Sequence, residues 1–172
     1  LEYYKDRSEF VKTGDFSLNV ANPITAALLK ERAALDLLTI SYDLNISQVL
    51  DLLGKAPPDW FELTLHQHMP MFHMEHCVFC SVLSPGTNKT NCGRPCDRHE
   101  VKLRDRVGAE HTLQADVACR NTLYNATPQS GAEIAGDLIQ RNVRWFRVEL
   151  LDESTEQTRR TIAIYRQLLS GE

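Results

Sequence analysis

The sequence lacks any apolar run approaching the roughly 20 residues that a membrane-spanning helix needs. Its first residues, LEYYKDRSEF, lack the basic start and apolar stretch of a signal peptide. The sequence also lacks a large excess of one charge sign, because the formal net charge is only −4. A net charge this small gives no overall field favouring nucleic acid or an anionic membrane. We therefore expect a cytoplasmic protein without a membrane partner, in which any RNA contact comes from a local patch.

Cysteine is missing from both ends of the chain, since all five cysteines lie between residues 77 and 119. All six histidines lie between residues 66 and 111. An odd number of cysteines crowded into one segment does not fit a disulfide framework spread through a small secreted domain, and it favours a reducing compartment. The middle third of the sequence therefore carries the chemistry, and its flanks are expected to be scaffold.

The N-terminal part predicts strands and helices in alternation. Pro23 follows Asn22 as the first residue of a helix whose apolar face includes Ile24 and Leu28. A second helix is expected to begin after Asn45 and to end near Gly54. The predicted strands are 16–22, 35–44 and 61–69, and the predicted helices are 23–34 and 45–55.

The C-terminal part predicts a β-hairpin around Val107 and Gly108, then helix, strand and helix. Ser130 is expected to cap the first of these helices. The predicted ranges are 100–117 for the hairpin, 130–142 for the helix, 143–151 for a buried strand and 154–170 for the closing helix.

Strands separated by amphipathic helices indicate parallel βαβ units. Four such strands make half of a (β/α)₈ barrel. We expect an α/β fold of one domain over residues 1–172: a partial TIM-barrel-like half-barrel with an inserted cysteine-rich loop and β-hairpin. Because the chain opens at Leu1, we also expect a fragment of a longer protein. Open strand edges predict a homo-oligomer or a partner segment that supplies the missing barrel half.

Residues 73–119 are predicted to bind a metal. Their cysteines follow the pattern Cys77-x₂-Cys80-x₁₁-Cys92-x₃-Cys96-x₂₂-Cys119. Two close pairs of thiolates suit tetrahedral zinc, and four thiolates also suit a [4Fe–4S] cluster. The spacing alone leaves both open. Two other interpretations remain: small buried apolar cysteines, or a nucleophilic cysteine with His73 or His76 as its base.

Histidines and arginines around the cysteines are candidates for substrate binding. His73 and His76 either contact substrate or donate hydrogen bonds behind the metal ligands. The basic stretch either forms a solvated strand face or holds phosphates, and interspersed acids weaken the second interpretation. The candidate substrate-binding residues are His73, His76, Arg94, Arg98 and Arg104.

At these residues the sequence resembles the peptidase U32 family. The resemblance rests on the strand leading into HMEHCVFC, on the stretch NCGRPCDRHEVKLRDRVGAEHTLQADVACRNTLYN, and on the closing VRWFRVELLDESTEQTRRTIAIYRQLL. It covers roughly residues 15–170. It implies that the chain is the C-terminal, cysteine-bearing half of a (β/α)₈-type barrel.

The resemblance also implies an activity. Members of the family hold a [4Fe–4S] cluster through four cysteines and support hydroxylation of RNA bases or of a small-molecule ring, while the older family name denotes collagenase-like proteases. We expect an iron–sulfur enzyme of hydroxylation, with RNA or a small molecule as substrate. The alternatives are a peptidase acting on proteins, although no Ser-His-Asp or HExxH pattern is evident, and a non-catalytic binding module stabilised by zinc.

The carry-over of ligands leaves one cysteine surplus. Cys77 matches the first family cysteine, Cys92 and Cys96 match a later Cys-x₃-Cys, and Cys119 lies near a distant last ligand. Cys80 departs from the family, which has a longer spacer after the first cysteine. The longer set that includes Cys119 would suit a cluster, and the compact set that includes Cys80 would suit zinc.

Overall fold

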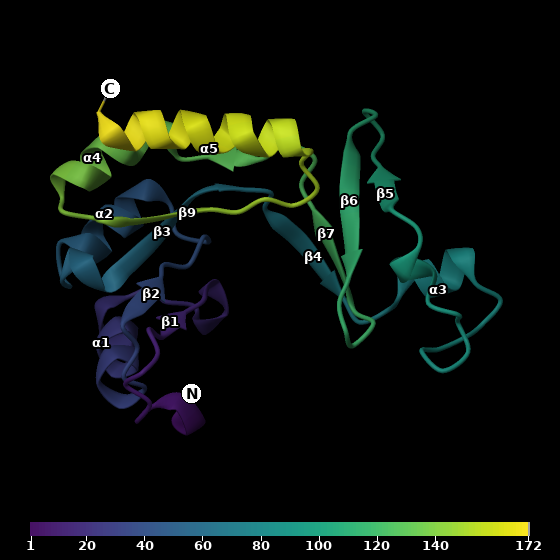
Figure 1. Cartoon of the computed structure of the whole chain (residues 1–172), viewed down its shortest axis with the longest axis horizontal. Helices are drawn as coiled ribbons and strands as arrows, with labels where there is room; N and C mark the ends of the chain where they lie inside the picture. Colours follow the sequence, from purple (N-terminus) through teal and green to yellow (C-terminus); the bar gives the residue numbers. More distant parts are fainter. Residues whose placement is uncertain (172) are drawn as a thin grey trace. The chain divides into compact units, whose positions relative to one another are not determined.

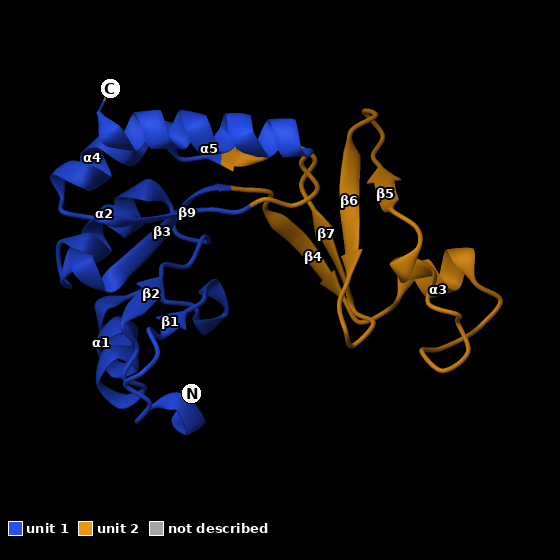
Figure 2. Ribbon diagram, viewed as in Figure 1, with its two compact units in different colours: residues 1–66, 130–149, 154–172 blue, residues 67–129, 150–153 orange. Residues whose placement is uncertain are grey.

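The computed structural model describes residues 1–171 and is a mixed α/β protein with one parallel and one antiparallel sheet. The expected α/β class is confirmed. Figure 2 shows two compact units: unit 1 holds residues 1–66, 130–149 and 154–171, and unit 2 holds residues 67–129 and 150–153. The single domain stays a prediction, because compactness alone does not say whether two parts fold separately. Within residues 1–171, no helix combines the length and apolar character needed to cross a bilayer.

Unit 1 is built on the parallel sheet (Figure 1). Strand β3 lies at its centre, with β2 and β9 as parallel partners, and β1 pairs in parallel with β2. The strands are β1 (Thr13–Gly14), β2 (Leu37–Thr39), β3 (Phe61–Gln67), β8 (Gln129–Ser130) and β9 (Trp145–Val148). The helices are α1 (Pro23–Arg32), α2 (Ile46–Leu53), α4 (Ala135–Gln140) and α5 (Thr155–Ser170).

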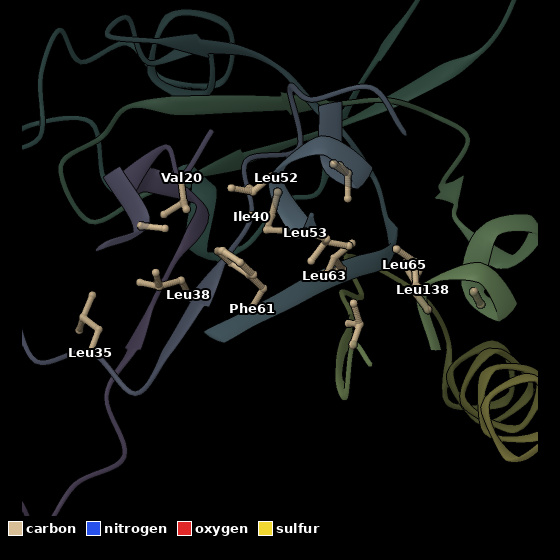
Figure 3. Close-up of a cluster of buried hydrophobic side chains, with 14 of the residues drawn as sticks. Val20, Leu35, Leu38, Ile40, Leu52, Leu53, Phe61, Leu63, Leu65 and Leu138 are labelled. Atoms are coloured by element: carbon tan, nitrogen blue, oxygen red, sulfur yellow. The ribbon is translucent and has the colours of Figure 1, made fainter. Parts of the chain in front are cut away.

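The core of unit 1 follows from alternation along β3. Phe61, Leu63 and Leu65 point to one face of that strand and are buried, as period-two patterning requires (Figure 3). Leu52 and Leu53 of α2 join the same cluster. Helix α2 begins after Asn45, where Asn45 and Gln48 form a reciprocal capping box, and it ends at Gly54 as expected.

Two predicted elements near the N-terminus differ from the structure. Residues 16–22 do not form a strand: Asp15 caps a 3₁₀ helix (Phe16–Leu18) by accepting the Phe16 N–H at 2.8 Å, and only Val20 bridges to the sheet. The predicted apolar face of α1 was also wrong. Ile24 is 73% exposed, while Ala26 is fully buried and belongs to the hydrophobic core of unit 1.

Two predictions near the C-terminus need correction as well. Ser130 lies in β8, and α4 begins only at Ala135. The Ser130 hydroxyl hydrogen-bonds to the Tyr165 hydroxyl at 2.8 Å and accepts the Ala132 N–H at 3.2 Å. Strand β9 is present but is not buried on both faces. Trp145 is 55% exposed, whereas Phe146 packs against the core.

Unit 2 is built on the antiparallel sheet, in the order β4-β7-β6-β5. Its elements are β4 (Pro70–Met74), α3 (Val78–Leu83), β5 (Val101–Arg104), β6 (Glu110–Ala115) and β7 (Asn121–Tyr124). The sequence suggested that the cysteine motif follows the third parallel strand directly. In the structure, strand β4 lies between β3 and the cysteines along the chain. The buried apolar core of unit 2 is small and consists of Phe79, Leu113 and Leu123.

The predicted hairpin at Val107 and Gly108 is confirmed as the β5–β6 connection. Asp105 organises the turn, since its Oδ1 accepts the N–H groups of Val107 and Ala109, each at 2.9 Å. His111 Nδ1 lies 3.1 Å from the Ala126 nitrogen and 3.2 Å from the Tyr124 carbonyl oxygen, and its Nε2 lies 3.4 Å from Asp105 Oδ2. Burial opposes the charge on Asp105, but these hydrogen bonds together outweigh burial and lower its pKa.

A depressed pKa makes the hairpin sensitive to acid. The stability that ionised Asp105 contributes is present above the unfolded pKa of about 3.9 and is lost as pH falls through the lower folded value. We expect the backbone NMR signals of residues 101–115 to show lower stability to urea at pH 3 than at pH 6. Asp105→Asn keeps an acceptor but removes the charge, and it should flatten this dependence. Asp51→Asn, at an exposed position of α2, is the matched control. Equal flattening of the pH dependence by both variants would contradict the role of Asp105 in the hairpin.

Candidate metal centre

The register of the antiparallel sheet brings the cysteine-bearing segments to one end of unit 2. Met74 at the end of β4 pairs with Asn121 at the start of β7. At the same end β6 runs into the turn before β7, and β5 begins at Val101. The chain from β4 to β5 must therefore cross this end, where Figure 1 shows α3 and the following loop. Cys77, Cys96 and Cys119 lie just beyond the three strand ends.

Cys77 occupies the N-cap position of α3. Its sulfur accepts the backbone N–H of Cys80 at 3.4 Å. Fully buried Asn121 of β7 joins the start of α3 to the sheet. Its Oδ1 accepts the Val78 N–H at 2.7 Å, and its Nδ2 lies 3.9 Å from the Cys77 sulfur. Two N–H groups are thus directed at the Cys77 sulfur, one from the backbone of Cys80 and one from the side chain of Asn121.

Cys92 sits in a tight loop after α3. The Cys92 sulfur accepts the N–H of Arg94 at 3.4 Å, and the Cys92 carbonyl accepts the Ser84 hydroxyl at 2.8 Å. Gly86 is required for this packing, since a Cβ there would lie 2.4 Å from the Asn91 carbonyl oxygen. Arg94 itself adopts the left-handed conformation with φ of 53°, which costs free energy for a non-glycine residue.

Cys119 is held in the turn between β6 and β7. Asp116 Oδ1 accepts the N–H groups of Ala118 and Arg120 at 2.8 and 2.9 Å, and the Asp116 carbonyl accepts the Cys119 N–H. Cys119 has φ of 65°, again in the left-handed region. The turn therefore fixes a strained cysteine at the same end of the sheet as Cys77.

Two cavities open among these segments. We call the first the cysteine cavity: it measures about 570 Å³, and its walls include His76, Cys77, Cys80, Cys92 and Cys119. The second, the loop cavity, measures about 380 Å³ and is bordered by Cys77, Cys92, Cys96 and Cys119. Three cysteines border both cavities, so the two spaces are neighbours around a common group of sulfurs.

Cys80 and Cys96 differ from the three shared cysteines in their surroundings. Burial raises the pKa of the Cys80 thiol, and the nearby Cys92 and Cys77 raise it further. The Cys80 S–H donates to the Gly86 carbonyl at 3.5 Å. Burial also raises the pKa of Cys96, and the Asp97 carboxylate beside it adds to that effect.

The donor chemistry fits a metal that prefers sulfur. All five cysteines are free thiols, and backbone and amide N–H groups point at the sulfurs of Cys77 and Cys92. Across the part of the chain that the structure describes, no three His, Cys, Asp or Glu side chains already surround a common point as metal ligands. Binding a metal would therefore require cysteine side chains to turn toward one centre.

The other predicted site residues divide between this centre and the sheet. His76 borders the cysteine cavity and Arg94 borders the loop cavity. His73 lies on exposed β4, with Nδ1 3.0 Å from the Thr122 hydroxyl. Arg98 donates to the Gly93 carbonyl, and Arg104 pairs with Glu110 across the hairpin. The structure thus brings the cysteines, His76 and Arg94 together, and it leaves His73 and Arg104 on the strands.

Sequence reasoning missed Asn121 and Gly86. Asn121 is the first residue of strand β7 and carries no motif of its own, so only the register with Met74 reveals its role. Gly86 had a weak signal as part of the Pro-Gly pair in the loop. Comparisons with protein-family models, curated proteins and solved structures gave no match to the chain.

Proposed function

We propose that the chain holds a [4Fe–4S] cluster through Cys77, Cys92, Cys96 and Cys119. The observation that carries the proposal is the convergence of these four cysteines on the loop cavity, although 22 residues separate Cys96 from Cys119 in the sequence. Four cysteine thiolates are the standard ligand set of such clusters, and N–H groups directed at sulfur tune them. The small core of unit 2 gives the cluster a further role in holding the loop.

Cys80 is the surplus cysteine in this proposal. It is 6% exposed, and its S–H is already engaged with the Gly86 carbonyl. It does not border the loop cavity, whereas the other four cysteines do. Its position on α3 leaves it as a wall of the cysteine cavity.

The cysteine cavity is the proposed substrate site. Its volume of about 570 Å³ lies in the usual range for small-molecule pockets. His76 would orient a substrate by hydrogen bonding, and the walls would restrict water. A small molecule is favoured over RNA because Arg94, which borders the neighbouring loop cavity, already pairs with Asp97 and so offers less positive charge to phosphates.

The proposed reaction is hydroxylation by an enzyme of the U32 type, with a base of RNA as the second possible substrate. When bound, the cluster would supply electron transfer. Unit 1 would form the C-terminal half of a (β/α)₈ barrel, which its parallel order β1-β2-β3 and the intervening helices α1 and α2 support. The missing half would come from a partner segment or from a second copy of the chain.

Mass spectrometry of the encoding organism tests the reaction. We expect deletion of the gene to remove one metabolite or nucleoside that differs from its precursor by a single oxygen atom. Wild-type protein should restore that compound, and Cys119→Ser protein should not. A deletion strain that keeps every oxygenated compound but accumulates uncleaved proteins would instead support the peptidase. Full restoration by Cys119→Ser would contradict a role for the cluster.

A further inference from the structure

A third cavity of unit 2, separate from the cysteine cavity and the loop cavity, is bordered in part by Leu151, Asp152 and Glu153. We call it the Lys102 cavity: it measures about 430 Å³ and is bordered by charged and apolar side chains. Its charged and polar walls include Lys102, Thr112, Asp152 and Glu153, and its apolar walls include Phe79 and Leu113. Its volume is ample for a small organic ligand.

The polar groups of the Lys102 cavity are only partly used. Asp152 Oδ2 accepts both the Thr112 hydroxyl at 2.8 Å and the Lys102 ammonium at 3.0 Å. Among residues 1–171, Asp152 Oδ1 has no hydrogen-bond partner, and Lys102 uses one of its three ammonium protons. Hydrogen bonds from Lys102 and Thr112 lower the pKa of Asp152, so the carboxylate is charged at neutral pH.

Glu153 places a second carboxyl group on the same wall. Its side chain is 11% exposed, and the Leu151 N–H donates to its Oε2 at 2.6 Å. Its other oxygen, Oε1, is buried without a hydrogen bond and faces His68 Nε2 at 3.3 Å. His68 is fixed in turn, because its Nδ1 donates to the Asn125 carbonyl at 2.7 Å. Glu153 is therefore a rigid, buried carboxylate beside the cavity.

We propose that the Lys102 cavity binds a small zwitterion, an α-amino acid with an apolar side chain. Lys102 would receive the ligand carboxylate, and Asp152 Oδ1 would receive its ammonium group. Val101 and Leu151, which border the same cavity and are partly exposed, would contact its side chain. A ligand with one charge meets repulsion from one of the two facing groups, whereas a zwitterion satisfies both. The Lys102–Asp152 pair is partly exposed, with side-chain exposures of 41% and 36%, so rearranging it costs little.

Binding of L-leucine, followed by NMR titration of the full chain, tests this proposal independently of any metal. Two isosteric analogues separate the charges: leucinamide carries only the ammonium, and 4-methylpentanoate carries only the carboxylate. We expect saturable binding of L-leucine and binding at least about tenfold weaker for each analogue, which corresponds to the loss of one charged contact.

Variants locate the site. Lys102→Gln and Asp152→Asn should each weaken L-leucine binding about tenfold, with the shifted signals confined to residues around the Lys102 cavity. Arg106→Gln removes a positive charge from the same hairpin outside the cavity and should bind as wild type does. Absence of saturable L-leucine binding, equal binding of leucinamide, or unchanged binding by the folded Lys102→Gln and Asp152→Asn chains would each overturn the proposal.

Discussion

Cys119→Ser chain purified without oxygen is expected to lose the iron–sulfur chromophore, whereas Cys80→Ala chain keeps it. Cys119 borders both cysteine-lined cavities and is the last of the four proposed ligands. A serine hydroxyl is a poor substitute for a thiolate at iron, so the cluster would lose one corner. Cys80, by contrast, donates to the Gly86 carbonyl and lies outside the loop cavity.

The pair of variants is matched because each removes one thiol from the same region. Visible absorption and bound iron per chain are the measurements, and circular dichroism in the far ultraviolet checks that unit 1 stays folded. The reverse pattern, with Cys80→Ala losing the metal and Cys119→Ser keeping it, would assign the compact set of Cys77, Cys80, Cys92 and Cys96. That set suits zinc, and the ligation by Cys77, Cys92, Cys96 and Cys119 proposed here would be contradicted.

Asn121→Ala should destabilise unit 2 by about 1–3 kcal/mol, the range for a polar group that loses its partner on burial. Asn121 is fully buried, and its side chain accepts the Val78 N–H at 2.7 Å. Removing that amide leaves the first turn of α3 without its tie to β7. The same change removes the N–H group near the Cys77 sulfur, so we expect metal affinity to fall about 10- to 100-fold, as for other residues that support ligands.

Asn125→Ala is the control for Asn121→Ala. Asn125 forms its hydrogen bonds through its backbone: its N–H donates to the Met69 carbonyl, and its own carbonyl accepts from His68. Losing the amide side chain there should leave both stability and metal affinity close to those of the wild type. Urea unfolding measures the stability of each variant, and competition with a chelator measures its metal affinity. Equal effects from the two variants would refute the role of the Asn121 side chain in joining α3 to β7.

Local signals in the sequence were sufficient for the elements with clear caps and periodicity. The helix after Asn45 and the hairpin at Val107 and Gly108 formed where expected, since capping and turn chemistry act over a few residues. Long-range partners decided the failures. The sequence predicts Ser130 as a helix cap, but in the structure it lies in β8 and its hydroxyl hydrogen-bonds to the hydroxyl of Tyr165, 35 residues away.

The candidate site was predictable as a list of residues but not as a geometry. The spacing of the cysteines indicated a thiolate site, yet it could not say whether Cys80 or Cys119 belongs with Cys77. Sheet register adds what the spacing lacks, the proximity of the turns that carry Cys77 and Cys119, because Met74 and Asn121 pair across β4 and β7. A pairing of this kind depends on the whole sheet and leaves no mark in a short motif. The same reason hid the Lys102 cavity, whose wall at Asp152 comes from a separate stretch of the chain.

Quantification of metal and inorganic sulfide in the chain purified under strict exclusion of oxygen tests the central proposal most directly. Ligation by Cys77, Cys92, Cys96 and Cys119 predicts about four iron atoms and about four sulfides per chain, with the broad visible absorption of a cluster. About one zinc atom per chain with no sulfide would contradict it and would support a structural zinc site in its place.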